Sequence, residues 1–76
     1  MSAQDATIQR LIAGYAQMTT EDICQYIQDE LFINAELKDD DSGADFAEII
    51  ESDDRLEALR RVINDRLGKQ KSKTYR

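Results

Sequence analysis

The helical spacing of the apolar residues, with no proline to interrupt it, constrains the fold of this chain most strongly. The 76 residues include no proline and only three glycines, which stand far apart at Gly14, Gly43 and Gly68. Residues of high helix propensity dominate, and no segment alternates apolar and polar residues as a half-buried strand does. The sequence therefore predicts an all-α protein, a small three- or four-helix bundle.

A first helix is predicted to begin near residues 2–5, where Ser2 or Asp5 can cap free backbone N–H groups. From Ile8 to Tyr15 its apolar residues recur at helical spacing and form one narrow stripe. The helix is expected to end near residues 15–18.

A second helix is predicted to begin at Thr19 and Thr20, because a threonine hydroxyl caps well and the following Glu21 and Asp22 favour the positive end of the helix dipole. Its apolar residues cover a broad arc, as expected for a central helix, and Phe32 points away from that arc. The arc consists of Ile23, Cys24, Tyr26, Ile27, Leu31, Ile33, Ala35 and Leu37.

Residues 38–43 predict a solvated turn, and the helical pattern resumes near Asp45. The apolar residues that continue the pattern are Phe46, Ile49, Ile50, Leu56, Leu59, Val62, Ile63 and Leu67.

The helix that resumes near Asp45 is either continuous through Ser52 or interrupted there. Apolar residues at seven-residue steps from Ile49 to Ile63 favour a continuous helix, which would place Asp53 on its buried stripe. The run from Ser52 to Asp54 is also a good helix cap with an acidic first turn. We expect a kink or a new helix at Ser52.

Gly68 fits a helix C-cap, with Arg66 and Lys69 compensating the negative end of the dipole. The prediction is therefore a single helical domain over residues 1–68, followed by a flexible basic tail over residues 69–76.

The charges are segregated along the chain. Residues 1–54 carry fourteen acidic and two basic side chains, whereas residues 55–76 carry two acidic and eight basic ones. The net charge of −6 therefore hides a strongly dipolar molecule. Such segregation indicates that a charged surface meets a partner protein, a nucleic acid or a second copy of the chain.

A domain this short is only marginally stable unless disulfides, metals or partner chains support it. Cys24 is the one cysteine, so no intrachain disulfide forms, and without histidine it makes a poor zinc site. Oligomerisation is the remaining common route. We expect a homodimer that completes the bundle, with the basic end of one chain against the acidic body of the other.

The expected location is the cytoplasm. The sequence contains no run of about 18 apolar residues, the length that a membrane-spanning helix needs. The N-terminal sequence also lacks the basic start and apolar core of a signal peptide. A single free thiol also fits a reducing compartment.

The sequence favours a protein without catalytic activity or cofactor. It has no histidine and no glycine-rich phosphate loop. Cys24 lies among carboxylates and is expected to be a small buried hydrophobe rather than a nucleophile.

The acidic turn has the composition of a calcium loop but not its spacing. Counted from Asp39, the turn glycine falls one position early at Gly43, and Ile50 stands where an EF-hand has its closing glutamate. No dedicated metal site is predicted, and weak divalent binding by the acidic residues of the turn is the alternative.

Gly43-Ala44-Asp45 resembles the stretch that precedes the phosphopantetheine-bearing serine in acyl carrier proteins, which are also small, acidic and helical. The resemblance implies a carrier function. Phe46 stands where that serine would follow, and Ser42 lies on the other side of the glycine. A degenerate acyl-carrier-like protein is therefore one alternative function.

The aromatic residues divide into core and surface candidates. Tyr15, Tyr26 and Phe46 fall on apolar stripes and are expected in the core. Phe32, with a polar rim around it, is the candidate anchor for a partner. The acidic residues expected to share that partner-binding surface are Glu21, Asp22, Asp29, Glu30 and Glu36.

The basic C-terminal segment supports a second alternative, a nucleic-acid-associated protein that contacts phosphates. Against it, the acidic body would repel the same polyanion. Arg60 and Arg61 are expected instead to pair with acids of neighbouring helices or of a second subunit. The candidate phosphate-binding residues are Arg60, Arg61, Lys69, Lys71, Lys73 and Arg76.

Taken together, these features predict an acidic helical interaction protein that regulates a larger protein by binding its surface, with a basic surface on that partner and no membrane or cofactor involved.

Overall fold

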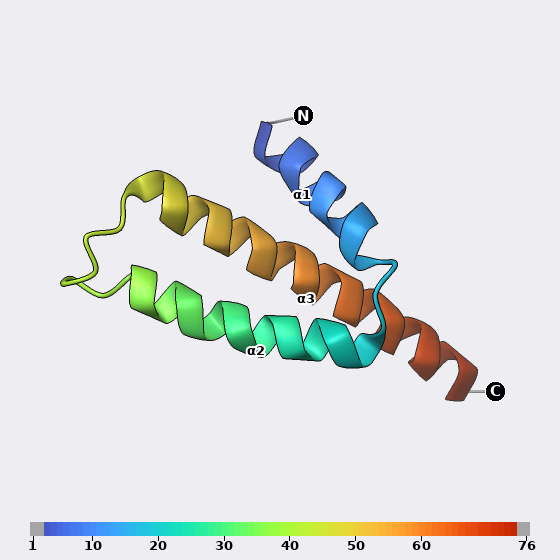
Figure 1. Ribbon diagram of the computed structural model, residues 1–76. Coiled ribbons are helices and arrows are strands. Elements are labelled where there is room, and N and C mark those ends of the chain that lie inside the picture. The colour runs from blue at the N-terminus through green and yellow to red at the C-terminus, as the bar shows by residue number, and fades with distance from the viewer. Residues whose placement is uncertain (1–2, 75–76) are drawn as a thin grey trace.

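The computed structural model describes the backbone of residues 3–74 and the side chains of residues 4–69. Its elements are α1 (Ala3–Tyr15), α2 (Thr20–Leu37) and α3 (Phe46–Thr74), and the described residues contain no strand. Helices α2 and α3 form an antiparallel hairpin, and α1 lies across α3 (Figure 1). The all-α prediction is confirmed, with three helices in this part of the chain.

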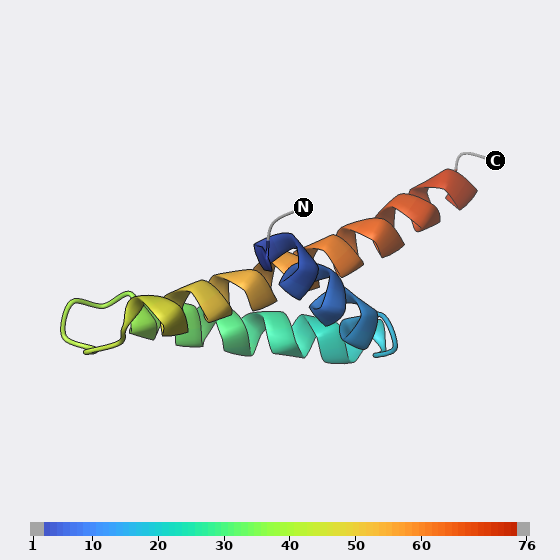
Figure 2. The same ribbon diagram turned by 90° about the horizontal axis from the view of Figure 1, so that it is seen from above.

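Helix α3 is the centre of the arrangement. Both α1 and α2 pack against it, and they contact each other only weakly. The molecule is elongated, with extents of 51 × 28 × 19 Å, and the C-terminal part of α3 projects beyond the other helices (Figure 2). Much of the hairpin is therefore left without a third helix against it.

Local side chains fix the starts of α2 and α3. The Thr19 hydroxyl accepts a hydrogen bond from the backbone N–H of Asp22 at 3.1 Å, which confirms the predicted cap. The Asp45 carboxylate accepts one from the backbone N–H of Glu48 at 2.9 Å and caps α3 in the same way. Short polar side chains before each helix thus set its first residue.

The core is small and lies where α1, α2 and α3 meet. Its buried apolar residues come from all three helices, and half-buried neighbours such as Ile12 and Tyr15 pack around it. The buried apolar side chains are Ile8, Ile23, Ala58, Leu59 and Val62.

Several residues predicted to be buried lie at the surface. Phe46 is 82 % exposed and Tyr26 is 51 % exposed, because α1 covers only part of the hairpin. The Tyr26 ring retains a tilted contact with half-buried Tyr15, with ring centroids 6.3 Å apart. Cys24 is also exposed. The predicted arc of α2 is thus wider than the face that α3 and α1 bury.

The new helix predicted at Ser52 is wrong, since α3 runs through this residue without interruption. A serine starts a helix when its hydroxyl accepts from a nearby backbone N–H. Here the Ser52 hydroxyl donates to Glu30 and accepts from the Asn34 side chain, both on α2. Asp53 is exposed rather than buried, and it accepts from Asn34 as well. Contacts across the hairpin occupy the groups that would otherwise cap a new helix.

The predicted end at Gly68 also differs from the structure, because α3 continues to Thr74. Much of the segment over residues 69–76 is therefore helical in its backbone, while residues 75–76 lie outside the described residues. The flexibility of this segment stays a prediction.

Arg66 has a role that the sequence did not indicate. Its guanidinium donates to the Thr20 hydroxyl at 2.8 Å and to the backbone carbonyl oxygens of Ala16 at 3.1 Å and Met18 at 2.6 Å. Carbonyls after the end of α1 lack helical partners of their own. Arg66 supplies those partners and ties the α1–α2 turn to α3.

Candidate protein-interaction surface

The outer side of α2 carries a row of acidic side chains. Together with Gln25 and Phe32, they follow steps of three and four residues from Asp22 to Glu36, which places them on one side of the helix, opposite the buried Ile23. No base lies among them, and all are exposed. This acidic face consists of Glu21, Asp22, Gln25, Asp29, Phe32 and Glu36.

Phe32 lies in the C-terminal half of the acidic face and is 69 % exposed. Asp29 and Glu36 precede and follow it by three and four residues, and so flank it on the helix surface. The Asp29 carboxylate also accepts a hydrogen bond from the Gln25 side chain at 3.1 Å. The structure thus brings together all of the predicted partner-binding residues except Glu30.

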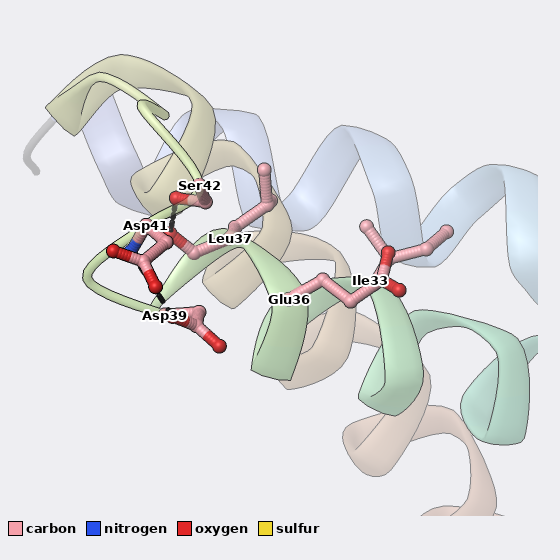
Figure 3. Close-up of a pocket in the computed structure, with 6 residues that line it drawn as sticks. All are labelled: Ile33, Glu36, Leu37, Asp39, Asp41 and Ser42. Carbon is pink, nitrogen blue, oxygen red and sulfur yellow. Dashed lines mark hydrogen bonds between the residues drawn. The ribbon is translucent and has the colours of Figure 1, made fainter.

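An open pocket of about 450 Å³ adjoins the acidic face at the C-terminal end of α2 (Figure 3). Glu36 belongs to both the acidic face and the pocket. The other lining residues are Ile33 and Leu37 from α2 and Asp39, Asp41 and Ser42 from the loop. A pocket with apolar walls and a carboxylate rim fits the side chain of a lysine or arginine, whose stem is apolar and whose head is charged.

Local hydrogen bonds hold the loop beside this pocket. The Asp39 carboxylate accepts from the backbone N–H of Asp41 at 3.0 Å, and the Ser42 hydroxyl donates to the Leu37 carbonyl at 2.8 Å (Figure 3). Gly43 follows with a φ of 71°, a conformation that glycine adopts without strain. The loop is therefore built as a defined turn.

Glu30 does not belong to the predicted partner-binding surface, because it is only 7 % exposed. It lies seven residues after Ile23 and four before Asn34, on the stripe of α2 that faces α3. On α3, Ser52 and Arg55 precede Leu59 by seven and four residues and face α2 in turn. Helical spacing could have placed Glu30 on this stripe, but its charge argued for the surface.

Buried Glu30 is fully partnered across the hairpin. It pairs with two guanidinium nitrogens of Arg55 and accepts from the Ser52 hydroxyl at 2.8 Å. Burial raises the pKa of Glu30, but the hydrogen bonds from Arg55 and Ser52 and the charge of Arg55 outweigh it, so the pKa lies below its ordinary value. Glu30 is therefore held ionised as part of the structure.

A second acid extends the same network at its exposed edge. Asp53 accepts from the Asn34 side chain at 2.9 Å and pairs with Lys38 at 3.1 Å. These hydrogen bonds lower the pKa of Asp53, and the one from Asn34 has the larger effect. The polar contacts thus run from Glu30 to Lys38 along the α2–α3 interface.

These lowered pKa values predict a pH dependence of stability. A carboxyl whose pKa is lower in the folded state stabilises the fold above its unfolded pKa, about 4.3 for a glutamate, and this contribution is lost as the pH falls through the folded pKa. We expect the difference in free energy of unfolding between the wild type and Glu30→Gln to shrink below about pH 4. Urea denaturation at pH 7, 4 and 3 measures it. A difference that stays constant over this range would contradict the lowered pKa of Glu30.

Three of the predicted basic residues, those whose side chains the structure describes, are engaged within α3. Arg61 donates to Glu57 at 2.8 Å, Arg60 lies 3.7 Å from the same carboxylate, and Lys69 pairs with Asp65 at 3.2 Å. The expected pairing of Arg60 and Arg61 with neighbouring helices is wrong, because an acid on their own helix is closer. The side chains of Lys71, Lys73 and Arg76 lie outside those that the structure describes.

The described residues contain no group of three His, Cys, Asp or Glu side chains placed to hold a metal ion. In the same part of the chain, no helix has the length and apolar character of a membrane span.

Comparison with protein-family models, with characterised proteins and with solved structures gave no match to this chain. The surfaces described above therefore carry the functional interpretation.

Proposed function

We propose that this protein is a non-enzymatic interaction protein that binds a basic surface of a larger protein and regulates it by occupying that surface. The observation that carries the proposal is Phe32, which is 69 % exposed and is flanked by the carboxylates of Asp29 and Glu36. Interfaces gain most of their affinity from a few buried aromatic or arginine anchors enclosed by a polar rim. Phe32 has this arrangement on the acidic face.

The electrostatics indicate the chemistry of the partner. Four carboxylates without an intervening base produce a negative field that speeds association with a basic surface. The pocket next to Glu36 adds a place for a lysine or arginine side chain of the partner. The partner in this proposal is a protein with a basic patch that includes an apolar cleft for Phe32.

Self-association and a cytoplasmic location belong to the same proposal. The small core and the incompletely covered hairpin support a homodimer, and an unpaired, exposed Cys24 fits a reducing compartment.

Neither alternative function gains support from the described side chains. For nucleic-acid binding, three bases of α3, Arg61, Arg66 and Lys69, already interact with groups of this chain. For a carrier function, the Ser42 hydroxyl bonds to Leu37 and Ala44 within the loop.

The test is to weaken the contact at Phe32 with a matched control. A partner is first captured on the immobilised protein from its native cell extract, identified by mass spectrometry and purified. We expect Phe32→Ala to raise the dissociation constant about 30-fold, since truncating an interface anchor costs about 2 kcal/mol. Isothermal titration or surface plasmon resonance gives the constants.

Phe46→Ala is the control, because Phe46 is also exposed, at 82 %, but lies outside the acidic face. It should leave the affinity for the partner unchanged. The reversals Asp29→Lys and Glu36→Lys should slow association and reduce its dependence on salt. Equal effects of Phe32→Ala and Phe46→Ala, or association insensitive to salt, would refute the proposed site.

A further inference from the structure

A second surface of the hairpin is only partly covered, with Ile63 at its inner edge packed against the core. Starting at the first residue of α3, steps of three and four residues define a stripe along one side of this helix. Its members are exposed or half-buried. This open face consists of Phe46, Ile49, Asp53, Leu56, Arg60, Ile63 and Leu67.

Helix α1 does not cover the open face. It contacts α3 at Asp54, which accepts from Gln4 at 3.0 Å, and beside Arg61 and Asp65, which line the cavity between the two helices. Asp54 follows Asp53 in the sequence, and Arg61 follows Arg60. Each step of one residue is a rotation of about 100° around the helix axis. Helix α1 therefore occupies a different side of α3.

Helix α2 borders the open face along its other edge. Lys38 pairs with Asp53 and so marks the side of α2 that adjoins it. Leu31 and Cys24 precede Lys38 by seven and fourteen residues and share that side. Leu31 is 54 % exposed, so this edge of α2 is open as well.

The sequence of the open face is complementary to itself when reversed. If a second α3 runs antiparallel with the two-fold axis between Leu56 and Glu57, positions whose numbers sum to 112 or 113 lie opposite each other within one residue, and Ile49 of each copy faces Ile63 of the other. The same register sets Asp53 opposite Arg60, and Phe46 opposite Leu67. In a two-fold interface each such contact occurs twice. Apolar residues meet apolar residues, and each acid meets a base.

The parallel orientation lacks this complementarity. It would set Asp53 against Asp53 and Arg60 against Arg60, and like charges that face each other across an interface are unfavourable. It would also align the two acidic loops. The antiparallel orientation instead places the loop with Asp39 and Asp41 toward the basic C-terminal end of the other α3. The charge distribution thus selects one orientation.

The length of the open face suits a stable contact. Its 22 residues extend for about 32 Å at 1.5 Å per residue, and its three-and-four spacing over three heptads is that of helices that pack along their length. We propose that two copies of this chain associate through their open faces with antiparallel α3 helices, which completes a four-helix core from two hairpins. The inference deepens the homodimer of the proposed function and uses a surface separate from the acidic face.

Sedimentation velocity on the full chain over a wide range of concentrations tests the association. We expect the mass to rise from one chain to two. Phe46→Glu and Leu67→Glu should each raise the dimer dissociation constant at least tenfold. Both residues are more than half exposed, so the helical content measured by circular dichroism should stay that of the wild type. A monomeric wild type at all concentrations would overturn the proposal.

Charge reversal tests the register. Arg60→Glu and Asp53→Lys should each weaken the homodimer at least tenfold, whereas an equimolar mixture of the two variants should form a heterodimer, since acid again faces base at both contacts. Asp53 also bonds within the hairpin, so circular dichroism checks that its variant is folded. If that variant is unfolded, the pair Phe46→Lys and Leu67→Glu replaces it, with the same expected recovery in the mixture. No recovery in a mixture of folded variants would overturn the register.

Cross-linking tests the orientation. In a Cys24→Ser background, Phe46→Cys and Leu67→Cys variants are oxidised separately and as a mixture. We expect disulfide-linked dimers to form mainly in the mixture, because position 46 of one copy faces position 67 of the other. Self-linking of the Phe46→Cys variant would indicate parallel helices and overturn the proposal.

Dimerisation through the open face and partner binding through the acidic face can be tested separately. Phe32→Ala should leave the dimer dissociation constant unchanged, while Phe46→Glu should leave capture through the acidic face unchanged. If each variant folds but loses both dimerisation and partner capture, the open face and the acidic face are not separate surfaces, and the proposal is overturned.

Discussion

The Leu59→Ala variant is expected to lose about 3–4 kcal/mol of its free energy of unfolding. Leu59 is only 1 % exposed and lies in the core with Ile23 and Val62. The substitution removes buried apolar surface and leaves a cavity at the place where all three helices meet. A single core of this size rarely provides more than about 3–5 kcal/mol. The variant should therefore be largely unfolded at 25 °C.

Circular dichroism at 222 nm during urea denaturation, at one fixed protein concentration, measures this loss. Ile50→Ala on the same helix is the matched control, because Ile50 is 47 % exposed and lies outside the open face. Its loss should stay below about 1 kcal/mol. Comparable losses at the two positions would mean that the core does not lie at Leu59.

Replacing Glu30 with alanine is expected to cost about 2–3 kcal/mol. The change leaves the buried Ser52 hydroxyl without its acceptor and Arg55 without its ion-pair partner. Breaking a buried pair costs about 3–5 kcal/mol when the remaining charge is sealed from water. The Arg55 side chain is 35 % exposed, so water solvates it and reduces the cost. The loss is still a large part of the stability of so small a domain.

Glu36→Ala provides the control for this prediction. It removes the same side chain from the same helix, six residues away, but from the exposed acidic face. Its free energy of unfolding should stay within about 0.5 kcal/mol of the wild type. If both variants unfold at the same urea concentration, Glu30 does not hold the hairpin together.

The two variants should also separate stability from binding. Glu36→Ala should keep the fold and weaken binding to a basic partner, whereas Glu30→Ala should weaken the fold. The sequence grouped these glutamates in one surface, whereas the structure buries Glu30 in the hairpin and leaves Glu36 exposed.

Much of the candidate site could be predicted from helical spacing. Phe32 falls opposite the apolar arc of α2, and the structure places it at the surface among acidic neighbours. Phe46 was predicted wrongly, because its spacing matches an apolar stripe that no helix of the same chain covers. An apolar stripe indicates that a face is suited to burial, and tertiary packing decides whether it is buried.

By itself, the sequence determined the local features: the all-α fold, the start of α2 at its Thr19 cap and the turn that follows Leu37. These features depend on residues within about one helical turn of each other. Only the tertiary structure decided that α3 continues through Ser52 and that Glu30 is buried. Both depend on hydrogen bonds between α2 and α3 over 18 to 25 residues of sequence. The same polar side chains could serve as helix caps, as surface charges or as buried hydrogen-bonding partners. The packing of the hairpin makes them buried partners, because an ionised group stays buried only when other groups satisfy its hydrogen bonds and charge.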